Sequence, residues 1–164
     1  MPCVRAYLVH HGDAVGPEVD LRRPLSAAGR ASTVCVAAEA AARGARPAVI
    51  WHSGKLRAKQ TAEIFWRSCN ALASCAAVRD LQPGDPPEWI RDTLRHEPRD
   101  MVIVGHFPHL PGLLALMRGD GHSTVAAFPL HGVVALRTDD DGENWTEEWR
   151  ISASDVGPER RIGT

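Results

Sequence analysis

Short apolar runs alternate along the 164-residue chain with longer segments in which apolar residues recur at helical spacing. A run that is almost continuously apolar is typical of a strand covered by helices on both faces. The clearest runs are residues 4–9, 48–51 and 101–104. Weaker strand signals lie at 76–78, and at 133–136 and 145–151, where the acidic turn 139–142 predicts a hairpin.

Four segments between these runs predict helices. Ser26 is suited to cap the first, an alanine-rich helix that reaches about Arg43 and that Gly44 would end. The other predicted helices are 56–72, 88–96 and 109–117.

The alternation of strands and helices predicts an α/β fold, a three-layer α/β/α sandwich with a mostly parallel central sheet, because parallel neighbours need a crossover connection. We expect residues 1–153 to form a single domain, since a chain of this length can bury one adequate core and no linker divides it. Gly, Pro and Arg are frequent near the end, which predicts a mobile tail over 154–164.

Charge and hydropathy argue against several classes of partner. Nineteen Lys and Arg against twenty Asp and Glu give a formal net charge of -1, so no global field attracts nucleic acid or anionic lipid. No apolar stretch approaches the roughly 20 residues that span a bilayer, and the apolar run near the N-terminus is too short for a secretory signal. We therefore expect a cytoplasmic protein.

The four scattered cysteines lack metal or redox spacing and predict reduced thiols.

Unusual polar side chains follow three of the predicted strands. They are His10 and His11 after the first strand, His52, Ser53 and Arg57 after the second, and His106 and His109 after the run 101–104. Ligands of open α/β sheets bind at the carboxyl ends of the strands, so this convergence predicts a functional site. Histidine titrates near neutrality and can be a nucleophile, a base or a metal ligand.

Arg57 is suited to bind an anion. Its planar guanidinium matches the geometry of a phosphate, and the start of a helix adds backbone N–H groups and a favourable dipole. The alternative is a surface arginine that pairs with Glu63.

Three segments of the chain resemble the signature segments of the histidine phosphatase superfamily. They are His11-Gly12 after a strand, the stretch from Ser53 to Ala62, and the stretch from Val104 to His109. Further similarity in Asp20, in Arg23-Pro24-Leu25-Ser26, in Gly29 and in Leu81 to Pro86 points to the phosphohistidine phosphatase branch, SixA-type. The resemblance covers roughly residues 4–137 and implies a phosphoglycerate-mutase-like fold.

The resemblance implies a role for each matching position. His11 would be the nucleophile that becomes a transient phosphohistidine. His106 and Arg57 would contact the transferred phosphoryl group, and the N–H of Phe107 would contribute. Phosphoryl transfer needs in-line positioning and stabilisation of charge above all, so no metal and no other cofactor is implied.

One position departs from that pattern. The family normally has arginine immediately before the nucleophile, where this chain has His10 in the phosphate-binding set. Loss of a charge-assisted contact would cost about 2–4 kcal/mol in the transition state.

For the proton donor, Asp85 lies in a region comparable to that of the family's acidic residue, and its alternative role is that of a turn residue beside prolines. Asp13 is a second candidate, while His52 and His109 are expected at the rim or in local hydrogen bonds.

The sequence thus predicts a metal-independent phosphatase that acts on phosphohistidine in a protein or on a small phosphate compound. A second hypothesis is a phosphate- or phosphopeptide-binding module in which His10 has impaired catalysis. Small-molecule phosphomonoesterase activity and a metal-dependent hydrolase are further alternatives. The metal ligands would be His10, His11, Asp13, His106 and His109. The charge of Arg57 beside such a cation, and the absence of strict metal-hydrolase spacing, argue against the last alternative.

Overall fold

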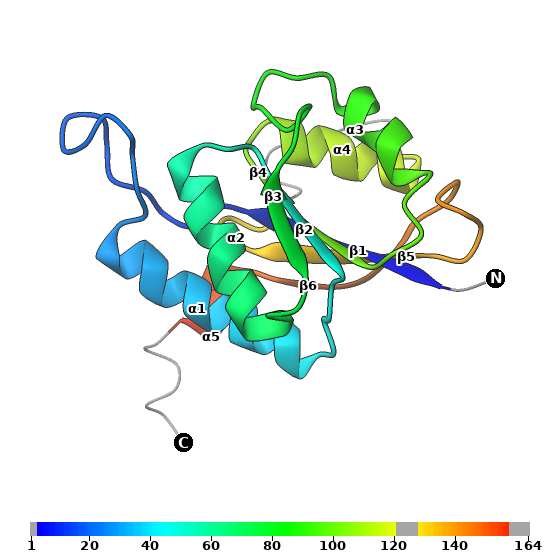
Figure 1. Ribbon diagram of the computed structural model, residues 1–164, viewed down its shortest axis with the longest axis horizontal. Coiled ribbons are helices and arrows are strands. Elements are labelled where there is room, and N and C mark those ends of the chain that lie inside the picture. The colour runs from blue at the N-terminus through cyan, green and yellow to red at the C-terminus, as the bar shows by residue number, and fades with distance from the viewer. Residues whose placement is uncertain (1–2, 121–127, 158–164) are drawn as a thin grey trace.

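The computed structural model describes residues 3–120 and 128–157. Its centre is one six-stranded sheet with helices on both faces (Figure 1). The strands are β1 (Val4–His10), β2 (Val49–His52), β3 (Ser74–Ala77), β4 (Met101–Gly105), β5 (Val133–Thr138) and β6 (Thr146–Ile151).

The sheet has the strand order β3-β2-β4-β1-β5-β6. The first four strands of this order are parallel to one another, whereas β5 is antiparallel to both of its neighbours, β1 and β6. The predicted α/β class with a mostly parallel sheet is confirmed.

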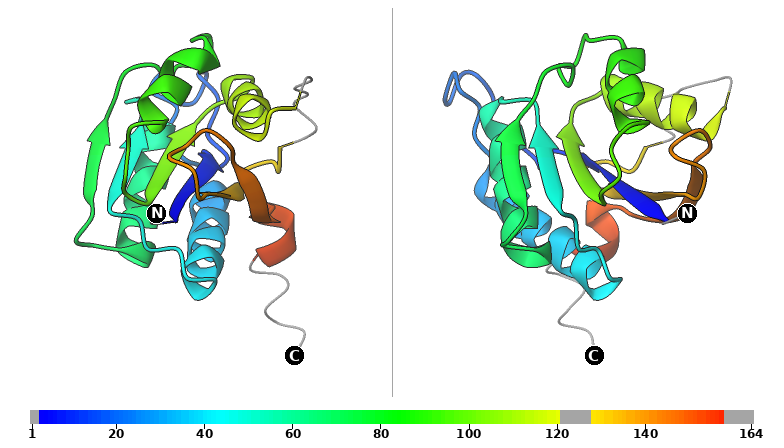
Figure 2. Two further views of the ribbon diagram at one scale, coloured as in Figure 1. Left: turned by 90° about the vertical axis from the view of Figure 1, so that its right-hand side faces the viewer. Right: turned by 45° about the vertical axis from the view of Figure 1, so that its right-hand side comes forward.

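Two helical layers enclose the sheet. The helices are α1 (Ala27–Ala42), α2 (Leu56–Cys69), α3 (Pro87–Leu94), α4 (His109–Arg118) and the short α5 (Ala153–Val156). Contacts join α1 to α2 and α5 on one face, and α3 to α4 on the other. Figures 1 and 2 show these two groups on opposite sides of the sheet, which confirms the three-layer sandwich.

The side chains of the central strands alternate between two buried clusters. Ile50 and Val102 face α1 and α2, whereas Met101 and Ile103 face α3 and α4. Burial on both faces explains why these strands are continuously apolar in sequence.

The first helix begins and ends where the sequence predicts. The Ser26 side chain accepts a hydrogen bond from the Gly29 N–H, which satisfies one of the free donors of the first turn. Gly44 has a φ of 91°, a conformation that favours glycine and ends the helix. Helix α2, by contrast, ends at Cys69, three residues before the predicted end.

The structure adds one short helix that the sequence analysis did not predict. Residues 153–156 span the predicted end of the domain at 153 and the start of the predicted tail, and they form α5, whose N-cap Ser152 makes a reciprocal capping box with Asp155. Ala153 and Val156 pack against the core cluster beneath α1. Residues 158–164 of the predicted tail lie outside the described residues.

Two properties of the whole chain follow from the coordinates. All four cysteines are free thiols, as the sequence predicted. Among the described residues, no helix has the length and apolar character needed to cross a membrane.

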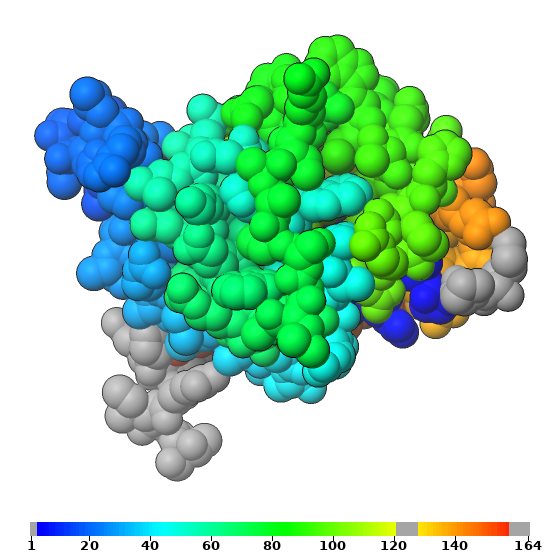
Figure 3. All heavy atoms as spheres, in the orientation of Figure 1, coloured from blue at the N-terminus to red at the C-terminus, as the bar shows by residue number. Residues whose placement is uncertain are grey.

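The connection between β1 and α1 projects from the body of the protein (Figures 1 and 3). Val19 and Leu21 in this loop are 72% and 88% exposed. The base of the loop is held by an isolated bridge between Ala14 and Leu25, and the Arg23 Nε donates to the carbonyl of Val15 at 3.1 Å.

Candidate active site

Three parallel strands deliver the predicted site residues to one edge of the sheet. His10 pairs with Gly105 at the end of β4, and His52 pairs with Val104 from the other side of β4. The residues that follow these strand ends, His11, Ser53 and His106, therefore lie next to one another.

Gly12 fits a narrow space between the sheet and two helices. Its N–H donates to the Thr61 hydroxyl of α2 at 3.0 Å. A Cβ at this position would overlap the Thr33 hydroxyl of α1 and lie 3.1 Å from the Gly29 carbonyl oxygen. Only glycine fits here, so the loop after β1 is tied to both helices and His11 is fixed beside them.

His11 has one ring nitrogen engaged by the backbone. Its Nδ1 lies 2.7 Å from the carbonyl oxygen of Gly12. Because a carbonyl can only accept, Nδ1 carries the proton and donates. The Nε2 lone pair is left available. Burial lowers the pKa of His11 to about 4, an effect that the hydrogen bond to Gly12 opposes and the charge of Arg57 reinforces. The ring is therefore uncharged at neutral pH, and a neutral imidazole with a free lone pair has the chemistry of a nucleophile.

His106 lies against His11 and is almost completely buried. The two ring centroids are 5.0 Å apart, and His106 is 2% exposed. Its Nε2 is 2.6 Å from the Ser53 hydroxyl, while its Nδ1 is buried without a hydrogen-bond partner. Burial is the main cause that lowers the pKa of His106 to about 3, followed by the charges of His11 and Arg57.

The proton of His106 can be placed from the contacts of Ser53. The Ser53 oxygen already accepts the Lys55 N–H at 3.3 Å, and among the described residues the Nε2 of His106 is the acceptor within reach of its hydroxyl. The hydroxyl therefore donates to Nε2, and the Nδ1 of His106 carries the ring proton. This buried N–H has no acceptor in the described protein.

Arg57 supplies a positive charge without a counter-ion. Its Nε is buried with no hydrogen-bond partner, and the described residues place no carboxylate in an ion pair with it, Glu63 included. Burial and the nearby charge of Arg23 lower the pKa of Arg57, yet a guanidinium stays protonated at physiological pH. An unpaired, half-buried arginine beside two neutral imidazoles can bind an anion.

His10 is enclosed between two rings. It stacks on Phe107 with a centroid distance of 3.9 Å and on His131 with 4.8 Å, both within 7° of parallel. The Nδ1 of His10 accepts the backbone N–H of His131 at 2.9 Å. Burial lowers the pKa of His10 to about 2, with further contributions from the charges of His11 and His131, so this ring is neutral.

Comparisons with known proteins are informative at the level of structure. No family model matches the chain, and no curated protein matches it in sequence. The protein histidine phosphatase SixA, solved with tungstate, superposes with a TM-score of 0.81 at 22% identity over 92% of this chain and 98% of that chain.

Two further solved structures extend this likeness. A candidate phosphohistidine phosphatase SixA from Agrobacterium tumefaciens gives a TM-score of 0.74 at 25% identity, over 91% of this chain and 97% of that chain. Phosphoglycerate mutase from Plasmodium falciparum gives a TM-score of 0.71 at 16% identity, over 96% of this chain and 94% of that chain.

The chain has the fold of a SixA-type histidine phosphatase. The resemblance carried by the three motifs is confirmed, and so is the phosphoglycerate-mutase-like architecture. In this SixA-type fold the segments that carry the motifs, widely separated in sequence, meet at His11, Arg57 and His106.

His131 is a site residue that the sequence analysis missed. Its Nδ1 lies 2.7 Å from the carbonyl oxygen of His11, so the ring donates to the backbone of the adjacent strand end. Residue 131 directly precedes β5, and because β5 is antiparallel to β1, its beginning lies beside the end of β1. The signal was present, since strand beginnings of antiparallel neighbours reach the same edge as the ends of parallel strands.

Arg23 is a second residue beside the site. Its charge lowers the pKa of both His11 and Arg57. Its φ of 50° is unusual for a residue with a side chain, and such backbone geometry concentrates at functional sites.

The two candidate proton donors, Asp85 and Asp13, each accept a hydrogen bond from a nearby group. The Asp85 carboxylate accepts the Gln82 N–H at 2.9 Å, the geometry of a turn residue. Among the described contacts it makes no hydrogen bond or ion pair with His11 or His106. Asp13 accepts the Ser26 hydroxyl at 2.8 Å, and its other oxygen is 4.0 Å from the Nε2 of His131.

Two further histidines differ in their surroundings. His52 accepts the Gly54 N–H at 3.1 Å, as expected for a local hydrogen-bonding group, and lines a separate cavity beside Cys75. His109 is only 1% exposed, so the prediction that it lies at the rim is wrong. It packs on the inner side of α4 because the helix begins directly after the buried end of β4.

The structure also allows the predicted metal site to be examined. One ligand atom each of His10, His11 and His131 lies within 4.8 Å of the others. Ring nitrogens at this spacing are candidates to share a zinc ion, which binds nitrogen atoms about 2.0–2.1 Å away. One nitrogen of each ring is already engaged with the backbone, so each ring has only its other nitrogen left for an ion.

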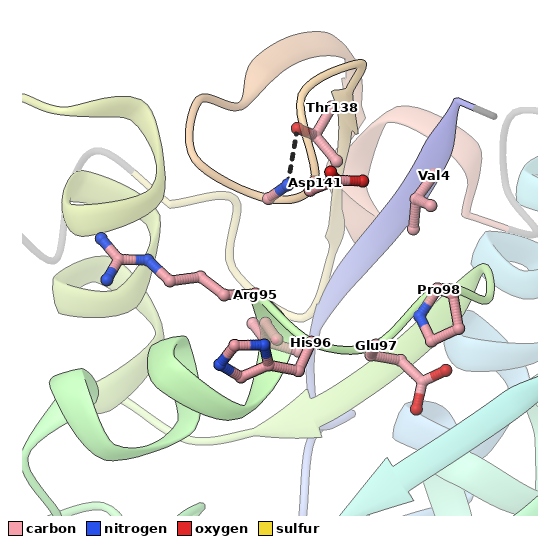
Figure 4. A pocket seen from close by; sticks show the side chains of 9 residues that line it. Val4, Arg95, His96, Glu97, Pro98, Thr138 and Asp141 are labelled. Carbon is pink, nitrogen blue, oxygen red and sulfur yellow. Dashed lines mark hydrogen bonds between the residues drawn. The ribbon is translucent and has the colours of Figure 1, made fainter. Parts of the chain in front are cut away.

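A cavity of about 320 Å³ opens at the other end of the sheet, where β1 begins (Figure 4). Its lining includes Val4, Arg95 and Thr138, whose hydroxyl accepts the Gly142 N–H at 3.2 Å. None of the predicted site residues lines this cavity.

Proposed function

We propose that this protein is a metal-independent phosphatase that works through a phosphohistidine intermediate on His11. The observation that carries this proposal is a neutral imidazole with a free Nε2 beside an arginine that pairs with no carboxylate of the described residues. Nucleophile and anion-binding group thus meet at one strand edge.

Two displacements at phosphorus make up the reaction. The lone pair of the His11 Nε2 attacks, a bond from nitrogen to phosphorus forms, and the bond to the leaving group breaks as that group takes up a proton. Water then attacks phospho-His11, the nitrogen–phosphorus bond breaks, and inorganic phosphate is released. The hydrogen bond from Nδ1 to Gly12 keeps the ring oriented through both steps.

Groups around His11 would stabilise the charge of the transferred phosphoryl oxygens. Arg57 contributes its guanidinium, and the buried Nδ1–H of His106 contributes a donor that has no protein acceptor in the described chain. His10 and the backbone N–H of Phe107, which comes directly after His106, complete the proposed phosphate-binding set. Such preorganised donors act most strongly where water is excluded.

We propose phosphohistidine in a protein as the substrate. The loop between β1 and α1 brings Arg23 to the site and projects Val19 and Leu21, whose exposed apolar side chains are available to contact a protein substrate. The SixA relative that superposes over 98% of its length is a protein histidine phosphatase and was solved with the oxyanion tungstate. An imidazole leaves readily once protonated, which reduces the need for an acidic residue such as Asp85.

The test compares wild type with His11→Ala on a phosphohistidine-bearing protein, phosphoramidate and a sugar phosphate. We expect release of phosphate from the first two by wild type and none above background by His11→Ala. Wild type quenched during turnover in alkaline detergent should carry a phosphoryl group that is lost in acid and that His11→Ala lacks. His96→Ala, which removes an exposed imidazole outside the site, is the matched control. Turnover by His11→Ala at the wild-type rate would refute the mechanism.

A phosphate-binding module is the second candidate, favoured by the neutral His10 at the position where the family has arginine. It predicts binding of orthovanadate without measurable turnover of any of the three substrates. Turnover that depends on His11 excludes it.

A further inference from the structure

The ring of His10 is held in one orientation by groups from two segments. Phe107 after β4 and His131 before β5 stack on its two faces, and the Nδ1 accepts the backbone N–H of His131. A ring flipped by 180° would put a carbon atom at the position of Nδ1 and lose this hydrogen bond.

The hydrogen bond determines which nitrogen carries the proton. Because a backbone N–H can only donate, the Nδ1 of His10 must present a lone pair, and the proton of the neutral ring is on Nε2. No described protein group accepts a hydrogen bond from this Nε2–H. The ring lies 4.5 Å from the ring of His11, centroid to centroid, so His10 is a direct neighbour of the proposed nucleophile.

His131 is itself tied in place by the strand that it contacts. Its Nδ1–H donates to the His11 carbonyl oxygen at 2.7 Å, and Gly132 beside it accepts the His10 N–H at 3.0 Å. These bonds hold the His131 backbone N–H opposite the His10 ring. The His131 side chain thus acts on His10 indirectly, through the position of its own backbone.

We propose that His131 is a positioning residue that fixes His10 as the Nε2–H tautomer, so that His10 gives the phosphate site a neutral hydrogen-bond donor in place of a charged arginine. This inference rests on the proposed function of the site. It concerns a residue outside the three motifs and explains how the site tolerates histidine before the nucleophile.

The surroundings of His10 keep the ring neutral. The groups whose charges act on it are His11 and His131 beside it, His106 after β4, and Arg57 of α2, and all of them oppose protonation. A donor that does not ionise near neutral pH should bind phosphate equally well across that range. An imidazolium would instead lose its contribution as pH rises through its pKa.

The first test reads the tautomer without reference to activity. Ring nitrogen chemical shifts of wild-type protein labelled with ¹⁵N-histidine should show His10 with an unprotonated Nδ1 and a protonated Nε2, unchanged from pH 5 to pH 8. The opposite tautomer, or titration to the doubly protonated form in that range, would overturn the proposal. His11 should show the reverse assignment and serves as the internal comparison.

The second test is a double-mutant cycle read by titration with orthovanadate. His131→Ala should weaken binding about 3- to 10-fold, the effect of one hydrogen bond, whereas His131→Asn should restore part of it because its amide can reach the His11 carbonyl. In a His10→Ala background, His131→Ala should change binding less than about twofold. Equal losses in both backgrounds would show that His131 does not act through His10.

These outcomes are separable from failure of the proposed function. If His11→Ala retains turnover, the mechanism is wrong, whatever tautomer His10 adopts. If turnover depends on His11 but the nitrogen shifts place the His10 proton on Nδ1, the mechanism stands and the role of His131 is wrong.

Discussion

At the scale of single residues, Ser53 is central to the proposed binding of a phosphoryl group by His106. Its hydroxyl donates to Nε2, which in the proposed mechanism leaves the Nδ1–H of His106 for a phosphoryl oxygen. Ser53→Ala removes that donor and leaves Nε2 buried without a partner, a change that costs about 1–3 kcal/mol. We expect kcat/KM for a phosphohistidine-bearing protein to fall about 5- to 150-fold.

The conservative variant Ser53→Thr separates this effect from simple loss of packing. It keeps a hydroxyl at the same position and should retain most of the activity that Ser53→Ala loses. Circular dichroism and thermal melting of both variants report whether the fold is intact. An unchanged kcat/KM for a folded Ser53→Ala would show that the proton of His106 does not depend on Ser53.

Sequence reasoning at this scale found the residues that follow parallel strands and missed one that precedes an antiparallel strand. His11, Arg57 and His106 could be predicted to meet because their strand ends share an edge. His131 was missed because a strand beginning reaches this edge only when the strand is antiparallel to its neighbour, and the predicted hairpin did not place β5 beside β1. For Asp85, spacing alone could not show that its carboxylate would bind the Gln82 N–H within its own turn.

At the scale of elements, α1 is docked on the loop that carries His11. The N–H of Ser26 donates to the Asp13 carbonyl at 2.9 Å, and a Cβ on Gly29 would overlap that same carbonyl group. Gly29→Ala must therefore push the first turn of α1 away from the loop. Overpacking of this kind costs about 1–3 kcal/mol, so we expect a lower Tm and weaker binding of orthovanadate.

Gly84→Ala is the matched control for this prediction. A Cβ on Gly84 meets no other atom within 4 Å, and its backbone φ is not in the left-handed region. Thermal melting and orthovanadate titration of the two variants give the comparison. Equal Tm values would show that α1 and the loop can separate without loss of stability.

Helices and strands could be predicted from the sequence where a single interaction, such as burial on both faces or a helix cap, dominates the local pattern. Burial on both faces gives β1, β2 and β4 their apolar runs, and a capped alanine-rich segment gives α1. The edge strand β3 is mostly exposed, so its pattern was weak. Helix α5 is only four residues long, and its packing beneath α1 could not be read from composition.

At the scale of the whole molecule, the histidine cluster should make the fold sensitive to acid. The pKa values of His10, His11 and His106 are lowered from 6.5 to about 2, 4 and 3, mainly by burial. Below pH 6.5 the unfolded chain therefore binds more protons than the folded chain. The free energy of unfolding then decreases as the pH is lowered. Each of the three contributes up to about 1.4 kcal/mol per pH unit while the folded ring stays neutral.

Urea unfolding between pH 7 and pH 4.5 measures this slope in a range above the titration of most carboxylates. We expect stability to be roughly constant above pH 6.5 and to fall steadily below it. His10→Gln replaces one titrating ring with a neutral amide, so the slope below pH 6.5 should be shallower by about one proton. His96→Gln removes an exposed histidine and should leave the slope unchanged. A free energy of unfolding that stays constant down to pH 4.5 would mean that the site accommodates charged imidazoles, which would contradict both the neutral nucleophile and the neutral donor at His10.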